Sequence, residues 1–103
     1  MKFNNYETIY ILRPSTQEKN NLIIANKYKS LIKKHGGQRI FIQYRGRRYL
    51  SYQIKSYWDG IYVQINYTAN TNLVKAIDKA IRFDDDILRC LTIKCKKEAI
   101  FND

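Results

Sequence analysis

Basic and aromatic side chains are interleaved along residues 44–67, which read YRGRRYLSYQIKSYWDGIYVQINY. Guanidinium groups bind phosphate oxygens through paired hydrogen bonds, and aromatic rings stack on unpaired bases. The stretch contains one carboxylate, Asp59, and offers none of the convergent bases, nucleophiles or metal ligands that an enzyme pocket needs. This pattern predicts an RNA-binding surface. A solvated β-hairpin with a basic face and ordinary aromatic cross-strand pairs fits the stretch equally well.

The whole chain carries a large excess of positive charge. Its 103 residues are expected to form a single domain, 1–103, with a core over about 4–97 and a short tail at 98–103. Nineteen lysines and arginines against nine acidic residues give a formal net charge of +10. Such an excess favours a polyanionic partner, either nucleic acid or an anionic membrane surface. No apolar run reaches the roughly 18 residues of a membrane span, and no basic helix carries bulky apolar anchors, so we expect no membrane partner.

Metal ligands are few and poorly spaced. Cys90 and Cys95 would lie about 17 Å apart on an extended segment, from a rise of about 3.3 Å per residue. A disulfide requires Cα atoms within about 7 Å, so we expect free thiols and a reducing compartment. With His35 they match no zinc spacing. Three adjacent aspartates at 84–86 predict a solvated turn rather than a cation site. We therefore expect no metal and no cofactor.

Hydrophobic periodicity predicts a strand and a helix in the first third of the chain. Residues 5–13 form the strand, with Tyr6, Thr8, Tyr10 and Leu12 on one face and Glu7, Ile9 and Ile11 on the other. Pro14 ends it. Residues 16–35 follow the helical period, and the spacing of Ser15 and Glu18 predicts a capping box at the start. Gly36 and Gly37 end this helix.

Two strands, a second helix and a last strand follow. We expect a strand over 38–54 with a bulge or close backbone approach at Gly46, a turn over 56–60 built on Asp-Gly, and a strand over 61–67. A helix over about 71–82, capped by Asn70 or Thr71, leads to a strand over 87–96. In that last strand Leu88, Cys90 and Thr92 are predicted on one face, and Arg89, Leu91 and Ile93 on the other.

The predicted order βαββαβ indicates an α+β, ferredoxin-like plait. Its four-stranded antiparallel sheet would carry both helices on one face. The first and last strands have apolar residues on both faces, although a sheet covered on one side should alternate more cleanly. Either a partner outside this chain covers the second face, or isoleucine occurs there for its strand propensity alone.

Three stretches resemble the family of the sixth protein of the bacterial-type small ribosomal subunit. They are Tyr6-Glu7 with Pro14 around the first strand, GRRYLSYQIK at 46–55, and RFDDDILRCLTIK at 82–94. The family favours Gly, a basic residue and then Leu-Ala-Tyr-Pro-Ile-Lys in the second stretch. This chain departs from it at Tyr49, Ser51 and Gln53, which alters local backbone shape and removes no basic residue. The resemblance covers nearly the whole chain.

The resemblance implies a structural protein of the small ribosomal subunit rather than an enzyme, with no small-molecule substrate. It implies binding to small-subunit (16S-type) rRNA in the central domain, together with the eighteenth small-subunit protein. The candidate phosphate-binding residues are Lys2, Arg45, Arg47, Arg48 and Lys55. Trp58 and Tyr52 are candidates for base stacking, with packing the favoured role of Tyr52. The candidate face for the protein partner comprises Ile9, Ile11, Arg89, Leu91 and Ile93.

Two alternatives share the predicted fold. A free-standing module for single-stranded RNA would carry exposed aromatic residues on its first and third strands. Here those positions hold Ile9, Ile11, Tyr62 and Gln64, which are mostly not aromatic. A small acylphosphatase-like hydrolase would need a glycine-rich phosphate loop after the first strand, and Arg13-Pro14-Ser15 does not provide one.

Amino acids with A- or T-rich codons are abundant, since Asn, Ile, Lys and Tyr supply 45 of the residues. This composition suggests an AT-rich genome. No transit or signal peptide is recognised at the N-terminus. We therefore expect a ribosome in the plastid (chloroplast) stroma, with the bacterial cytoplasm as the alternative.

Overall fold

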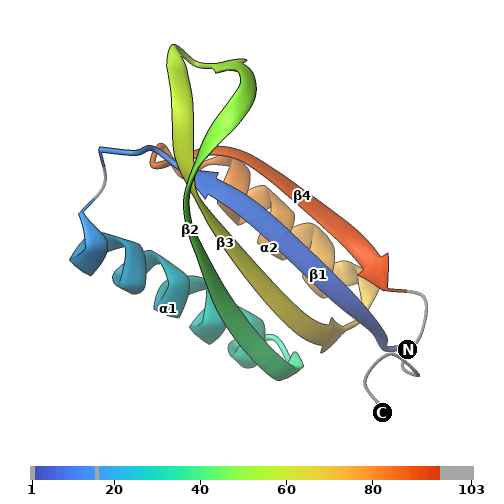
Figure 1. The fold of residues 1–103 in the computed structure, drawn as a ribbon. Coiled ribbons are helices and arrows are strands. Elements are labelled where there is room, and N and C mark those ends of the chain that lie inside the picture. The colour runs from blue at the N-terminus through green and yellow to red at the C-terminus, as the bar shows by residue number, and fades with distance from the viewer. Residues whose placement is uncertain (1, 16, 96–103) are drawn as a thin grey trace, which may run out of the picture.

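Four strands and two helices make up the computed structural model, which describes residues 2–15 and 17–95 (Figure 1). The elements are β1 (Asn4–Leu12), α1 (Glu18–Lys34), β2 (Gln38–Ile54), β3 (Tyr57–Ala69), α2 (Thr71–Arg82) and β4 (Ile87–Cys95). This is the predicted βαββαβ order. The predicted tail at 98–103 and the last residue of the predicted strand 87–96 lie outside the described residues.

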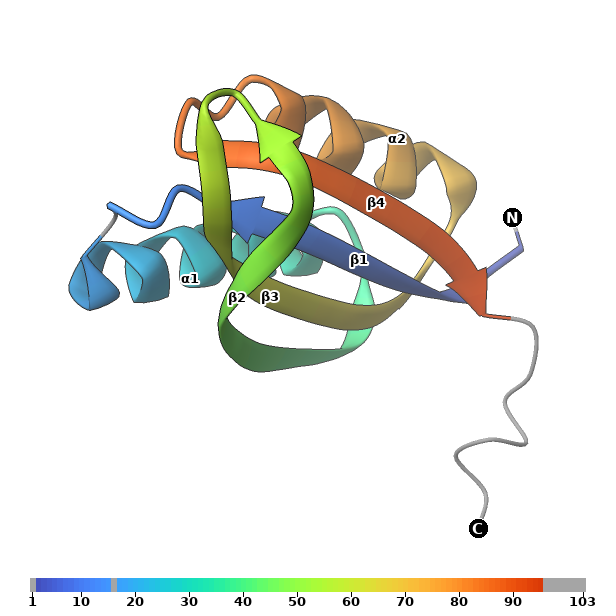
Figure 2. The ribbon, with the colours of Figure 1, turned by 45° about the horizontal axis from the view of Figure 1, so that its top comes forward.

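The strands form one antiparallel sheet in the order β2-β3-β1-β4. Both helices lie on the same face of this sheet (Figures 1 and 2). The predicted ferredoxin-like plait is confirmed. Among the described residues no helix covers the opposite face, which we call the open face.

The core fills the space between the sheet and the helices. Alternate side chains of the strands point into it, as predicted, and α1 and α2 each contribute the apolar side chains of one helix face. The buried side chains include Tyr6, Tyr10 and Leu12 of β1, Ile61, Val63, Ile65 and Tyr67 of β3, Ile24, Tyr28 and Ile32 of α1, and Leu73, Ile77 and Ile81 of α2. Thr8 is also fully buried, and its hydroxyl group lies 2.8 Å from the Tyr67 hydroxyl and 2.9 Å from the Thr92 hydroxyl. The buried Thr8 hydroxyl in the middle of β1 is thus satisfied.

The two helices begin differently. Asn70 caps α2, because its side chain accepts a hydrogen bond of 2.9 Å from the Leu73 backbone N–H. The capping box predicted at Ser15 is wrong. Gln17 occupies the cap position of α1 in an extended conformation and makes no side-chain cap hydrogen bond. The first helical bond runs from Asn21 N–H to the Gln17 carbonyl, so the helix starts too late for Ser15 to cap it.

The turn between β2 and β3 also differs from the prediction. It consists of Lys55 and Ser56, whose φ angles of 47° and 73° match the two-residue hairpin loops that follow the strand twist. The predicted turn residues Asp59 and Gly60 lie within β3. Gly60 is needed there for close packing, since an added Cβ would lie 2.3 Å from Ile11 Cγ2.

Bulges interrupt two strand pairs. Tyr44 pairs with Val63 and Gly46 with Tyr62, so Arg45 is the extra residue, and Gly46 has a φ of 86°; the predicted bulge is confirmed. Leu12 pairs with Ile87 and Ile11 with Arg89, which makes Leu88 the extra residue in β4. Ile87 therefore enters the core, and Leu88 packs with Ile11 and Ile54 in a second cluster. The prediction that Leu88 shares the face of Cys90 and Thr92 is wrong.

The aspartates before β4 are not simply solvated, which corrects the prediction for 84–86. The Asp84 side chain is 9% exposed and accepts a 2.7 Å hydrogen bond from the Tyr28 hydroxyl. Lys27 lies 3.8 Å from the same carboxylate. Asp86 forms an ion pair with Arg13 at the end of β1. These contacts fasten the loop to α1 and β1.

Within residues 2–15 and 17–95, no three His, Cys, Asp or Glu side chains are grouped closely enough to hold a metal ion. Both cysteines are free thiols, and burial raises the pKa of each. The helices in this part of the chain are too short or too polar to cross a lipid bilayer.

Candidate nucleic-acid interface

The distal half of the β2–β3 hairpin, residues 45–59, extends past the end of β1 (Figure 1). We call this segment the arm. It bends over the open face near the place where β1 ends and β4 begins (Figure 2). Its residues Leu50 and Ile54 pack on Ile11 and Leu88. The arm thus has a small apolar core of its own, on the side of the sheet opposite the main core.

Polar contacts hold both sides of the arm. Arg47 donates a 3.0 Å hydrogen bond to the Pro14 carbonyl, and its Nε lies 3.4 Å from Asp59 Oδ2. Arg89 donates a 2.7 Å hydrogen bond to the Tyr52 hydroxyl, and its guanidinium lies 5.5 Å from the centre of the Tyr52 ring. These contacts join the arm to the end of β1 and to β4, so its position relative to the sheet is set by side chains at both flanks.

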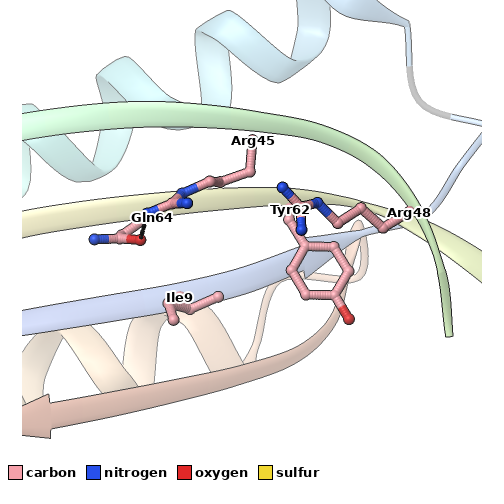
Figure 3. A pocket seen from close by; sticks show the side chains of 5 residues that line it. All are labelled: Ile9, Arg45, Arg48, Tyr62 and Gln64. Atoms are coloured by element: carbon pink, nitrogen blue, oxygen red, sulfur yellow. Dashed lines mark hydrogen bonds between the residues drawn. The ribbon is translucent and has the colours of Figure 1, made fainter. Parts of the chain in front are cut away.

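The arginines of the arm point in two directions. Arg47 pairs with Ile61, whose side chain enters the main core, and reaches Pro14. Arg48 pairs with Gly60, which faces Ile11 on the opposite side. Arg45, the bulged residue, donates a 2.7 Å hydrogen bond to Gln64 Oε1 (Figure 3). Alternation along β2 therefore divides the predicted basic cluster between two surfaces.

Arg45 and Arg48 line the same recess on the open face. With Ile9, Tyr62 and Gln64 they line a recess of about 220 Å³, which we call the hollow (Figure 3). Gln64 is 6% exposed and donates a 2.9 Å hydrogen bond to Asn66 Oδ1. The Arg45 guanidinium is thus oriented by a chain of amide groups along β3.

The other predicted RNA-binding residues are spread over the molecule. Lys55 lies exposed in the hairpin turn, and Trp58 is 58% exposed on the arm. Tyr52 is 53% exposed, and Arg89 contacts both its hydroxyl and its ring. Lys2 is exposed but precedes β1 at the end where Asn4 pairs with Ala69, whereas the arm follows the Leu12–Ile61 pair. The structure therefore does not bring Lys2 to the arm.

The predicted partner face is partly open and partly covered. Leu91 is 57% exposed, Ile93 is 44% exposed, and Ile9 beside them is half-buried. Ile11 is only 9% exposed, because the arm of the same chain covers it. Little of the Ile11 side chain is therefore left for an outside partner. Arg89 is exposed but is engaged with Tyr52.

Sequence reasoning placed Tyr62 and Gln64 on the open face but missed their meeting with Arg45 and Arg48. The glycine at the bulge was the available signal, since a bulge redirects the side chain beside it. Sequence reasoning also did not identify Phe41 as an exposed aromatic residue. Its side chain is 59% exposed, and it pairs with Asn66 at the edge of the open face.

Comparison with known proteins places this chain in a family. The sequence model described as "Ribosomal protein S6" matches residues 5–94. The small ribosomal subunit protein bS6c of Gracilaria tenuistipitata is 58% identical over 94 residues, which cover 91% of each chain. The small ribosomal subunit protein bS6 of Picosynechococcus sp. is 39% identical over 97 residues, covering 94% of this chain and 84% of the other.

A solved structure agrees with the fold. The crystal structure of 30S ribosomal protein S6 from Thermotoga maritima superimposes with a TM-score of 0.85 at 23% identity, covering 91% of this chain and 89% of the other. The sequence matches carry the assignment, and the homologues are structural ribosomal proteins rather than enzymes. This chain belongs to the ribosomal protein S6 family of the small ribosomal subunit.

Proposed function

We propose that this chain binds small-subunit rRNA together with the eighteenth small-subunit protein. The observation that carries the proposal is that two chemically different surfaces, the arm and the open face, lie next to each other. The arm presents exposed cations and an exposed indole, while the open face presents exposed aliphatic side chains beside it. The first surface suits RNA, and the second suits a protein.

The RNA contacts are assigned to Lys55, Arg47 and Trp58 on the arm, with Lys2 as a separate contact at the far end of β1. Lys55 and Trp58 are exposed, and the Arg47 side chain is 63% exposed despite its contact with Asp59. Lys and Arg contacts to phosphate fix the position of a protein on RNA without reading sequence. The net charge of +10 supports such binding through the release of counterions.

The protein contact is assigned to Ile9, Leu91 and Ile93 on the open face. Ile9 pairs directly with Leu91, and Ile93 lies two residues further along β4, so the three side chains are contiguous. Clustered exposed aliphatic groups of this kind mark interaction sites more often than isolated ones do. A protein partner would remove them from water.

We place this ribosome in the plastid stroma, with the bacterial cytoplasm as the alternative. Support comes from the AT-rich codon composition and from the bS6c relatives of Gracilaria tenuistipitata and Pyropia yezoensis, which are 58% and 50% identical.

A free-standing module for single-stranded RNA is the competing function. It would use aromatic side chains at the centre of the open face. The residues that β1 and β3 place there are Ile9, Ile11, Tyr62 and Gln64, and a single one of them is aromatic. The structure gives this alternative no specific support.

Substitution of Leu91 by Glu tests the protein contact. The Leu91→Glu variant should bind the eighteenth protein at least about tenfold more weakly, because a carboxylate would be desolvated at the interface. Leu22→Glu is the matched control, since Leu22 is also 57% exposed but lies on α1. Isothermal titration calorimetry measures both affinities, and circular dichroism checks the fold. Equal affinity of the Leu91→Glu variant and the wild type would contradict the proposed contact.

A further inference from the structure

Charged and apolar side chains on the open face follow a definite order along the strands. One row across the sheet contains Asn66, Glu7 and Ile93, and the next contains Gln64, Ile9 and Leu91. The hollow with Arg45 and Arg48 lies beyond Ile9, towards the arm. Reading from Glu7 to the hollow, the face therefore presents a carboxylate, an aliphatic centre and then two guanidinium groups.

The hollow concentrates positive charge. Arg45 uses one N–H on Gln64, which leaves further donors of its guanidinium for another acceptor. Arg48 lies in the same recess, and among the described residues the salt bridges are made by Arg13, Lys27, Arg47 and Arg82 rather than by Arg48. Two guanidinium groups in one recess repel each other, and a carboxylate between them would relieve that repulsion and accept hydrogen bonds from both. The amide chain from Arg45 through Gln64 to Asn66 orients the first guanidinium before any binding occurs.

The carboxylate of Glu7 lies at the other end of this order. From Glu7 to Ile11 the strand advances four residues, or about 13 Å at about 3.3 Å per residue, and the hollow lies between the levels of Ile9 and Ile11. Measured along the strand direction, the hollow is therefore displaced from Glu7 by roughly 7–13 Å, and Ile9 lies at the intermediate level. A binding segment can satisfy both ends at once only in one direction along β1.

We propose that the open face recognises its protein partner by this charge order. A carboxylate of the partner enters the hollow between Arg45 and Arg48, an apolar group covers Ile9, Leu91 and Ile93, and a cationic group lies over Glu7. The proposal rests on the protein partnership proposed above and adds the chemistry of the partner segment and its direction. It also moves Arg45 and Arg48 from the RNA-binding residues to the partner-binding ones.

A protein segment fits this surface better than RNA does. Phosphates that approached the two arginines would bring further negative charge towards Glu7, which repels it. A sugar–phosphate backbone also offers no cover for Leu91 and Ile93, which are 57% and 44% exposed. Complementary charges around an apolar centre are characteristic of protein–protein interfaces and fix their register.

Charge reversal at each end tests the order. The Arg48→Glu and Glu7→Lys variants should each bind the eighteenth small-subunit protein about tenfold more weakly, or worse, in calorimetric titrations at constant salt. The Lys75→Glu variant makes the same charge change as Arg48→Glu at an exposed position of α2, and should bind within about twofold of the wild type. Replacing the partner's acidic residue that enters the hollow by lysine should restore the affinity of the partner for the Arg48→Glu variant.

The outcomes separate this proposal from the function on which it rests. If the wild type does not bind the eighteenth protein, both proposals fail. If the wild type binds and Leu91→Glu weakens binding, but Arg48→Glu and Arg48→Ala bind like the wild type, the contact stands and the charge order is overturned. A flatter salt dependence of RNA binding in those two variants would then show that the hollow binds phosphate.

Discussion

Tyr10 and Tyr28 are both fully buried, and their rings meet edge to face with centroids 6.0 Å apart, but their hydroxyl groups differ. The Tyr28 hydroxyl donates a 2.7 Å hydrogen bond to Asp84. Within the described residues the Tyr10 hydroxyl has no hydrogen-bond partner. Burial raises the pKa of both phenols, and the bond to Asp84 adds to the rise at Tyr28.

Removing each hydroxyl should therefore have opposite effects on stability. Tyr10→Phe should raise the free energy of unfolding by about 1 kcal/mol, because an unpaired buried hydroxyl is removed. Tyr28→Phe should lower it by about 1–3 kcal/mol, because the Asp84 side chain is 9% exposed and loses the hydrogen bond that the Tyr28 hydroxyl donates to it. Urea denaturation measures both, and destabilisation of similar size in the two variants would contradict the difference inferred for their hydroxyls.

Asp84 shows where residue-level prediction stopped. The alternation of Tyr6, Tyr10 and Leu12 was enough to predict their burial. Three adjacent aspartates give no periodic signal, so the sequence could not show which of them turns inward. The answer depends on α1, since the Tyr28 hydroxyl that donates a hydrogen bond to Asp84 lies 56 residues away in the chain.

At the scale of elements, the arm depends on a close contact between β3 and β1. A Cβ at Gly60 would lie 2.3 Å from Ile11 Cγ2 and 3.1 Å from the Leu12 carbonyl oxygen. Gly60→Ala should therefore destabilise the protein by about 1–3 kcal/mol, the usual range for overpacking. Hydrogen exchange should be faster at the base of the arm than in the wild type.

Ile11→Ala in the same background is the control for Gly60→Ala. It removes the atom that would clash, so the double variant should be more stable than the sum of the two single losses predicts. Additive losses would show that the clash with Ile11 is not the cause. Gly46→Ala provides a second comparison, because its φ of 86° is strained for alanine although no atom lies within 4 Å of the added Cβ.

The elements themselves were largely predictable, and their connections were less so. Apolar alternation, and a cap expected at Asn70 or Thr71, predicted the strands and α2 to within a few residues. Asp59-Gly60 suggested a turn, but Gly60 serves packing against Ile11, and the turn formed at Lys55-Ser56 instead. The bending of the arm over the open face could not be predicted, because it results from a bulge at Arg45 together with contacts from β1 and β4.

At the scale of the whole molecule, burial of three tyrosines predicts sensitivity to alkali. The pKa of Tyr10, Tyr28 and Tyr67 is raised above the ordinary value of 10.0, with desolvation as the largest cause. Above pH 10 the unfolded chain loses phenolic protons that the folded chain keeps. The unfolded state then binds fewer protons, so stability is fully present below pH 10 and falls as the pH rises further.

Urea unfolding between pH 8 and pH 11 would measure this loss. Deprotonation of lysines changes the net charge of +10 over the same range. The series should therefore be repeated at about 1 M salt, where the Debye length is about 3 Å and long-range charge effects are screened. A free energy of unfolding that stays constant to pH 11 at high salt would contradict the burial of neutral phenols.

The fold also explains why a partner was expected from the sequence. The apolar residues on the second face of the first and last strands fall into two groups. Ile11 and Leu88 are covered by the arm of the same chain, whereas Leu91 and Ile93 stay exposed. The sequence could show that both faces were apolar but not which residues the chain itself would cover.

The most direct test of the central claim is the affinity for a central-domain fragment of small-subunit rRNA, measured with and without the eighteenth protein at several salt concentrations. We predict weak binding by this chain alone, tight binding of the pair and a steep salt dependence, which Lys55→Ala should flatten by about 0.7–0.9 units. Tight binding of any single-stranded RNA by this chain alone, dependent on Trp58 and indifferent to the partner, would contradict the account.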